Sequence, residues 1–391
     1  MDGAVNLAPS LYGVFRDGLS FHWMFWSLAV LTPLMALCVY YGIPAPPAAP
    51  RKGPAPSFGG FLYASGGFAL LFAALDQGQR LDWWRSGLFT ALILGAAIFL
   101  LSSLVRRLRM PNPLVDLPYL RQWNTQLLGV GLMLFRFSLL STIILVPQAL
   151  GIHGFEADQI GPAVLWTGLP QFLIALVAAL LLLQGLDSRL LMAAGFVCMA
   201  FAVILNAQLT SAWSASNFYR TELLMGVGQS FAFIGLVATI VLQAIFSGGL
   251  AKPQDALTFS AFFHIVRLLG GEIGVSYMLH FVAVREDLHS NLLGLHVEKG
   301  APLSDHALHQ LSAGFYPHSS GLPAAIGRAA GLIGARGRLQ AYTLRLADGF
   351  LLVAWACVVA LLLIAMLRRS PFSYKEVGFQ EEVPGSPKDR S

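Results

Sequence analysis

The sequence predicts an all-α fold, a polytopic helical membrane protein with about nine transmembrane helices. Hydrophobic residues make up 56% of the 391 residues and charged residues only 12%, whereas a soluble globular domain carries about 25% charged residues. The mean hydropathy is +0.66. A membrane-crossing helix needs about 20 apolar residues, and separate runs of that kind recur along the chain. The composition therefore excludes an ordinary soluble protein, a disordered chain and a collagen-like fibre.

The apolar runs follow one another with short polar connections, and each is long enough for one crossing of the hydrocarbon core. Three cysteines, Cys38, Cys198 and Cys357, lie inside these runs and are interpreted as small buried hydrophobic residues rather than disulfide partners. In chain order the nine predicted spans are 21–43, 58–75, 87–105, 124–146, 160–183, 190–209, 222–246, 257–284 and 349–367.

The connections between spans differ in length and charge. Prolines and the pair Arg51 and Lys52 mark 44–54 as a water-facing linker, and Asp187 and Arg189 mark a tight turn. The segment of about 285–348 is expected to be a long external loop.

Lys and Arg favour the cytoplasmic side of a membrane protein. The basic residues that gather on one side are Arg51, Lys52, Arg106, Arg107, Arg109, Arg121, Arg189, Lys252, Arg368 and Arg369.

This bias predicts a multi-pass membrane protein with a cytoplasmic C-terminus and a disordered cytoplasmic tail at 370–391. Nine crossings then place the N-terminus outside. Residues 1–20 lack the basic start and apolar core of a cleavable secretory peptide. Because the basic residues cluster at the ends of apolar runs, the net charge of +5 is attributed to membrane orientation, and a nucleic acid partner is not expected.

No catalytic motif is found in the sequence. A phosphate-binding glycine loop, a Gly-x-Ser-x-Gly elbow and a His-Glu-x-x-His pair are all absent, so neither an enzyme nor a cofactor is expected. The histidines of the predicted external loop match no closed metal site, and no metal is expected. These histidines are His289, His296, His306, His309 and His318.

Several short segments resemble, in order, those of the EmrB-like drug:proton antiporters, the fourteen-span branch of the major facilitator superfamily. They are APSLYG at 8–13, DGLSFHWMFW at 17–26, LDQGQRLDWW at 75–84, NPLVDL at 112–117, VPQ at 146–148 and RLLGGEIG at 267–274. The resemblance implies a partial major facilitator fold that corresponds to spans six to fourteen, with the first five spans missing. Ala8 and Tyr12 depart from the glycine pattern of the family's fifth span.

On that resemblance, residues 1–110 hold the end of an N-terminal bundle and the extra central spans. Residues 111–369 form a C-terminal six-helix bundle that includes the external loop. The family's function implies proton-coupled efflux of lipophilic drug-like or toxic compounds across the bacterial inner membrane. Membrane lipid, a small lipophilic substrate and protons are the implied partners, and a periplasmic adaptor protein follows by analogy. The alternative is a truncated, non-transporting remnant or interaction module that needs a separate N-terminal half.

Ionisable residues inside a span are costly and demand a partner or an aqueous cavity, so they are candidates for the substrate or proton pathway. Arg136 lies near the middle of the fourth span, and Arg267 and Glu272 lie in the eighth. Arg267, Gly271 and Gly274 share one helical face, with His264 close to it. Pairing of Arg136 with Glu272 or Glu222 is expected, and Glu272 is the favoured proton-coupling carboxylate.

The seventh span adds Glu222, Gly226 and Gln229, whose spacing of four and three places them on one polar stripe that faces protein or water. Two interpretations of Glu222 are open, a place in the pathway or a solvated position at the outer end of the span. For Arg267 and Arg136 a role in helix packing is the alternative to a role in coupling. Aromatic residues that suit a lipophilic substrate or face lipid are Phe135, Phe137, Trp166, Phe231 and Phe233.

Overall fold

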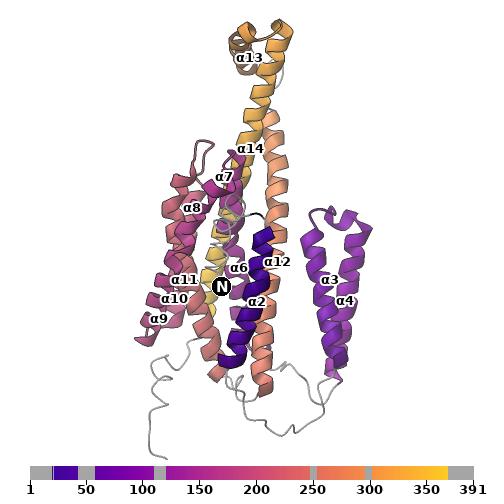
Figure 1. Cartoon of the computed structure of the whole chain (residues 1–391), viewed down its shortest axis with the longest axis vertical. Helices are drawn as coiled ribbons and strands as arrows, with labels where there is room; N and C mark the ends of the chain where they lie inside the picture. Colours follow the sequence, from indigo (N-terminus) through magenta and orange to yellow (C-terminus); the bar gives the residue numbers. More distant parts are fainter. Residues whose placement is uncertain are drawn as a thin grey trace, which may run out of the picture.

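The described part of the chain is helical and contains no strand in the computed structural model (Figure 1). The structure describes residues 20, 22–42, 58–109, 120–246, 253–295 and 302–368. The features of the sequence that fall outside these ranges include the segment 8–13, the linker 44–54, the motif at 112–117, Lys252, His296, Arg369 and the tail at 370–391.

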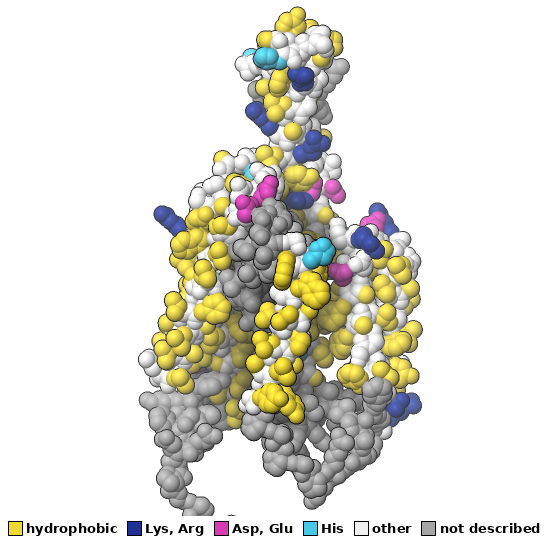
Figure 2. Space-filling view, in the orientation of Figure 1, with side chains coloured by type: hydrophobic (Ala, Val, Ile, Leu, Met, Phe, Trp, Pro, Cys, Tyr) yellow, Lys and Arg dark blue, Asp and Glu magenta, His cyan; other side chains and the backbone are white. Residues whose placement is uncertain are grey.

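Nine helical segments of the described chain are long and apolar enough to cross a membrane, which confirms the predicted fold class. Hydrophobic side chains cover their flanks in Figure 2. The segments are α2 (His22–Gly42), α3 (Phe58–Gln77), α4 (Gly87–Leu108), α6 (Trp123–Ser138) with η2 (Ser141–Leu145) and α7 (Val146–Ile152), α8 (Ala157–Gly168) with α9 (Pro170–Leu183), α10 (Ser188–Asn206), α11 (Ala215–Phe246), α12 (Pro253–Gly294) and α14 (Leu322–Met366).

The spans from α6 onward pack around one apolar core. Phe135 of α6 and Phe196 of α10 are completely buried, as is Phe350 of α14. The rings of Phe135 and Phe233 of α11 stack at 5.5 Å between centroids. Phe135 therefore packs in the core and does not face lipid. The predicted division of the chain at residue 110 stays a prediction.

Glycines let α10 and α11 approach until their backbones touch. A Cβ atom on Gly235 of α11 would lie 2.6 Å from the backbone nitrogen of Met192 and 2.7 Å from the carbonyl oxygen of Ser188. A Cβ atom on Gly228 would lie 2.8 Å from the carbonyl oxygen of Gly195. Lipid solvates apolar helices as well as another helix does, so close packing of this kind is what holds membrane helices together.

The hairpin of α3 and α4 lies beside this bundle (Figure 1). Its glycines Gly66 and Gly67 face Phe99 and Leu100 of α4. The hairpin meets α12 where the Ser276 hydroxyl donates to the carbonyl oxygen of Leu75. At the turn that carries η1 (Trp83–Arg85), the Trp83 ring lies 5.4 Å from that of His280.

α2 differs from the other spans because none of its apolar window, Phe25–Gly42, is buried. Cys38 on this helix is exposed, whereas Cys357 in α14 is buried and Cys198 is partly buried. The sequence prediction of three buried cysteines is therefore right only for Cys357. Among the described residues, no neighbouring helix buries the apolar run around Cys38.

The segment 285–348, which the sequence predicts to be a long external loop, is mostly helical where the structure describes it. α12 continues to Gly294, and α13 (Pro302–Phe315) and η3 (Tyr316–His318) precede α14. At 1.5 Å per residue the 45 residues of α14 measure about 68 Å, twice the thickness of the hydrocarbon core. We call the described residues 285–295 and 302–348 the extension, because they project beyond the bundle (Figure 1).

Ion pairs hold the base of the extension together. Asp348 of α14 accepts a hydrogen bond from Arg285 Nε of α12 at 2.5 Å and lies 2.7 Å from His289 Nε2. Glu286 of α12 pairs with Arg345 of α14. Figure 2 shows charged side chains on the extension above the apolar flanks of the bundle. We refer to the end of the bundle that carries the extension as the extension side, and to the opposite end as the tail side.

Candidate functional site

Glu222 is the one glutamate or aspartate with a fully buried side chain in the described part of the chain, at 0% exposure. α11 begins at Ala215, seven residues before the position at which the sequence predicts the span. Glu222 therefore lies about 10 Å inside the helix at 1.5 Å per residue. The alternative of a solvated helix end is wrong, because neighbouring helices enclose this carboxylate.

Three neutral side chains hold the Glu222 carboxylate. The Thr142 hydroxyl of η2 donates to Oε2 at 2.8 Å, and the Thr167 hydroxyl of α8 lies 2.7 Å from the same oxygen. Asn206 Nδ2, at the end of α10, donates to Oε1 at 3.4 Å. Thr142, Thr167 and Asn206 are all fully buried. The donors come from three different helical segments, so the carboxylate joins elements that are distant in the sequence.

The polar stripe predicted on α11 faces protein along its length. Gly226 lies against α8, where a Cβ atom would be 2.7 Å from the carbonyl oxygen of Thr167. Gln229 is buried, accepts a hydrogen bond from Gln171 Nε2 at 2.5 Å, and donates to the Thr142 hydroxyl at 3.5 Å. The network therefore runs from Glu222 through Thr142 and Gln229 to Gln171.

Two interruptions of regular α-helix lie beside this network. The π-helical segment η2 carries Thr142, and π-bulges occur frequently at functional sites. Pro170 begins α9 between Thr167 and Gln171, and proline has no N–H to donate to the preceding turn. Both helices that present threonines to Glu222 are thus irregular near the point of contact.

Thr142, Thr167, Asn206 and Gln171 are site residues that the sequence reasoning did not identify. Each lies in a different helical segment, and no sequence spacing connects them. One local signal was present: Pro170 inside an otherwise apolar run marks a break in the fifth span.

Arg136 lies on α6, partly buried, and faces α12. Its Nη2 atom would lie 3.3 Å from a Cβ atom on Gly271. A Cβ on Gly270 would be 2.9 Å from the Met133 backbone, so small residues do allow the close approach of α6 and α12 expected from the sequence. The expected pairing of Arg136 with Glu222 is wrong, because the partners of that carboxylate are the two threonines and Asn206.

The other predicted pathway residues lie on α12, apart from the Glu222 network. Arg267 and Glu272 are partly buried, and His264 is exposed with its ring 5.6 Å from that of Phe263. The structure does not bring them together with Glu222 and Gln229 in one site. A pairing of Arg136 with Glu272 stays a prediction.

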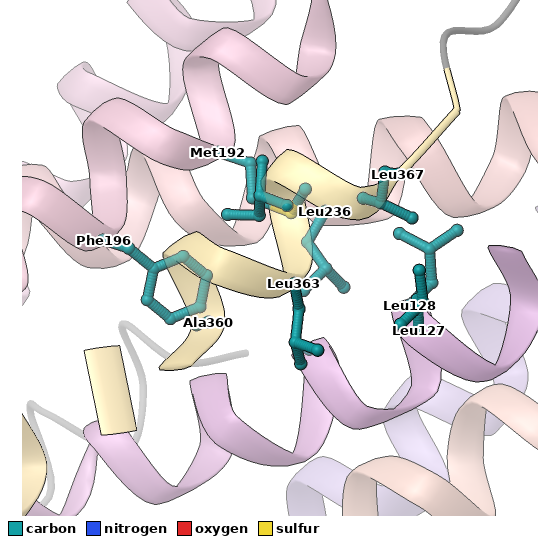
Figure 3. A pocket seen from close by; sticks show the side chains of 10 residues that line it. Leu127, Leu128, Met192, Phe196, Leu236, Ala360, Leu363 and Leu367 are labelled. Atoms are coloured by element: carbon teal, nitrogen blue, oxygen red, sulfur yellow. The ribbon is translucent and has the colours of Figure 1, made fainter. Parts of the chain in front are cut away.

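A small apolar cavity lies nearer the tail side, between α6, α10, α11 and α14 (Figure 3). Leu128, Met192, Phe196 and Leu363 are among its lining side chains. Its volume of about 10 Å³ accommodates at most one water molecule. A drug-sized ligand needs a pocket of about 300 Å³ or more, so this cavity is no substrate site in the conformation described.

Comparison with known proteins gives three relatives at low identity, and no family model matches the chain. The fatty acid resistance protein FarB of Neisseria gonorrhoeae is 28% identical over 246 residues, which are 62% of this chain and 47% of FarB. The colistin resistance protein EmrB of Acinetobacter baumannii is 24% identical over 279 residues, 69% of this chain and 51% of that protein. The multidrug export protein EmrB of Haemophilus influenzae is 25% identical over 250 residues, 63% and 47% of the two chains.

The chain spans about half the length of these curated relatives. The motifs in the sequence and the whole-chain comparisons agree on the same group of proteins. The resemblance inferred from the motifs is therefore confirmed: this multi-pass helical chain is similar to EmrB-type and FarB-type resistance proteins over roughly half of their length.

Proposed function

We propose that this chain is part of a secondary transporter that moves small lipophilic compounds out across the bacterial inner membrane in exchange for protons. The observation that carries the proposal is its similarity to three proteins named for resistance or multidrug export. Their names mention compounds of more than one kind, which favours a broad lipophilic class over a single substrate. The role is transport rather than catalysis.

The proton and substrate pathway in this proposal uses the buried polar groups of the bundle. Glu222 and Gln229 form its part on α11, while His264, Arg267 and Glu272 form its part on α12, and Arg136 lies on the facing helix α6. An ionisable group inside a span is expensive, so its presence favours a functional role. Secondary transporters commonly bind substrate near the midplane and alternate access by moving helical groups against one another.

The orientation follows from the bias of Lys and Arg. With the tail side cytoplasmic, the extension projects into the periplasm. There it is available to a periplasmic adaptor protein, a partner proposed by analogy. The ion pairs at its base, which include Arg285 with Asp348, keep the two long helices together outside the bilayer.

The experiment that tests the proposal is transport by the purified chain in liposomes. An acidic interior is imposed, and uptake of a fluorescent lipophilic dye and of a labelled fatty acid is followed. Proton exchange predicts uptake that depends on the pH gradient and stops when a protonophore collapses it. Uptake that does not depend on the pH gradient would contradict proton coupling.

Glu272→Gln is expected to abolish gradient-driven uptake without impairing membrane insertion, and wild-type uptake by that variant would remove Glu272 from the mechanism.

The second candidate is a non-transporting module that works only with a separate N-terminal half. It is favoured by the complete exposure of the apolar window of α2, Phe25–Gly42, together with the position of the α3–α4 hairpin beside the bundle. The same liposomes distinguish the two candidates. Uptake that is absent with the chain alone and appears on co-reconstitution with the first half of FarB would favour the module; uptake by the chain alone would exclude it.

A further inference from the structure

The Thr167 hydroxyl lies between two acceptor oxygens of one residue. Thr167 Oγ1 is 2.9 Å from the backbone carbonyl oxygen of Glu222 and 2.7 Å from its carboxylate Oε2. A threonine hydroxyl has a single proton to donate and can also accept. Thr167 can therefore donate to one of these oxygens at a time, and its proton reaches the other by rotation about one bond.

In the ionised state of Glu222, both threonine hydroxyls donate to Oε2 and Asn206 Nδ2 donates to Oε1. Hydrogen bonds to a charged group are about twice as strong as neutral ones, so these three donors stabilise the ionised form. The carboxylate is thus satisfied without a cation.

In the protonated state, the acid proton on Oε2 is donated to Thr167 Oγ1, and the Thr167 hydroxyl turns to the Glu222 carbonyl oxygen. Every donor then has an acceptor, and no heavy atom needs to move. A second acceptor is at hand, because Asn206 Oδ1 is buried with no hydrogen-bond donor in the described structure. A rotation of the Asn206 amide would bring that oxygen to a proton on Oε1. The site accommodates both protonation states in one heavy-atom arrangement.

No charged group among the partners of Glu222 fixes its charge. The elements packed against α11 carry few titratable residues: Arg136 on α6, Asp158 on α8, and Arg189 and Cys198 on α10, while η2 and α9 carry none. On α11 itself, Tyr219 and Arg220 precede Glu222. None of these is a hydrogen-bond partner of the carboxylate. A structural salt bridge would hold the glutamate ionised, and this site has none.

We propose that Glu222 is a proton-binding site of the bundle and that the Thr167 hydroxyl is the positioning group that serves both of its protonation states. On release, the O–H bond of the acid breaks, the electron pair stays on Oε2, and the proton passes to water admitted from the aqueous phase. Proton uptake reverses these steps. Because an isolated charge is costly between helices, proton release favours an arrangement of helices that admits water to Glu222. Proton uptake favours the closed arrangement described here.

The irregular helices can link protonation of Glu222 to a change in helix arrangement. Thr142 belongs to η2, and Thr167 is followed within three residues by Pro170. Regular helical hydrogen bonding is already interrupted at both positions, so a small rearrangement there breaks fewer backbone bonds. The assignment rests on the proposed transport function for its purpose, but proton binding itself is measurable without transport.

The test is infrared difference spectroscopy of the purified full chain in lipid nanodiscs, titrated with pH. A carboxylic-acid C=O band is expected that titrates in the wild type and is lost in Glu222→Gln. Thr167→Ser keeps the hydroxyl and is expected to keep the titration. Thr167→Val removes a donor to the charged form and an acceptor for the acid proton, and the charged form loses more because its hydrogen bond is about twice as strong. The proton affinity is therefore expected to rise about tenfold, moving the band's midpoint up by about one pH unit.

A band that persists in Glu222→Gln and disappears in Glu272→Gln would overturn the assignment, as would equal midpoints in Thr167→Val and Thr167→Ser. Proper folding of each variant is checked by its elution profile and helical circular dichroism. Loss of the band in Glu222→Gln together with no dye uptake by the wild type, either alone or co-reconstituted with the first half of FarB, would uphold the site while refuting the transport proposal. Gradient-driven dye uptake by the wild type together with an unchanged infrared band in Glu222→Gln would support the transport proposal and refute the assignment of Glu222.

Discussion

Replacing Gly235 by alanine tests whether the contact of α10 with α11 stabilises the bundle. The three atoms nearest to the added Cβ atom would all be backbone atoms of α10: Met192 N at 2.6 Å, Ser188 O at 2.7 Å and Met192 Cα at 2.9 Å. Carbon atoms in good contact are about 3.5–4.0 Å apart. The two helices would therefore have to separate by about 1 Å, and no flexible side chain is present at this point to relieve the clash.

The size of the effect follows from two opposing terms. Overpacking a dense interior costs about 1–3 kcal/mol, and we expect the upper value because the opposing atoms are backbone. Alanine is about 1 kcal/mol more favourable than glycine within a helix. The net loss in the free energy of unfolding is then about 2 kcal/mol. At about 2–4 °C per kcal/mol this lowers the melting temperature by about 6 °C.

The assay is thermal unfolding of the purified protein in detergent, followed by tryptophan fluorescence. Gly334→Ala is the matched control, because Gly334 also lies in a helix, α14, but a Cβ atom there meets nothing within 4 Å. That variant is expected to melt at the wild-type temperature or slightly above it. If Gly235→Ala also melts there, the backbone contact does not stabilise the bundle and the reasoning is refuted.

Two further predictions concern ionic contacts at opposite ends of the bundle. Arg189 Nη1 donates to the carbonyl oxygen of Leu367 at 2.9 Å, so Arg189→Gln should accelerate amide hydrogen exchange in the last turn of α14, and unchanged exchange there would contradict a capping role. Asp348→Asn weakens the shared partner of Arg285 and His289 at the base of the extension. Spin labels on α12 and α14 in the extension should then show a broader distance distribution, and an unaltered distribution would mean that these ion pairs do not hold the two helices together.

The number and order of spans could be predicted from the sequence because hydropathy is a local property. The third predicted span, 87–105, matches α4 (Gly87–Leu108) within three residues at each end. The eighth, 257–284, is contained in α12 (Pro253–Gly294). An apolar run of about 20 residues has few alternatives in a membrane, so tertiary contacts hardly change the outcome.

The extension could not be recognised by the same criterion, because its helices lie in a polar stretch. The part of α14 before Asp348 contains many alanines, leucines and arginines, which are strong helix formers, and these outnumber its four glycines. An apolar-run criterion ignores that preference. The ion pairs of Asp348 and Arg345 with α12 supply the tertiary contact that makes two long helices stable outside a bundle.

The candidate site could not be predicted from hydropathy, because the position of a residue along a span does not determine whether neighbouring helices bury it. Glu272 lies deep in an apolar run but is only partly buried, whereas Glu222 follows a polar segment and is fully buried. What encloses Glu222 is Thr142, Thr167 and Asn206, and each belongs to a helix that packs against α11 from another direction.

A carboxylate placed at mid-span by hydropathy can still face a wet groove, where its charge costs little and neither protonation state is favoured by the fold. A carboxylate surrounded by neutral donors is different, because adding or removing one proton changes the charge of a closed interior. Any movement of the helices that present Thr142 and Thr167 must then alter its proton affinity, and by linkage its protonation must alter the preference between helix arrangements. Glu222 satisfies this condition on the contacts observed, and so substitution of Glu272 alone cannot decide how this bundle binds protons.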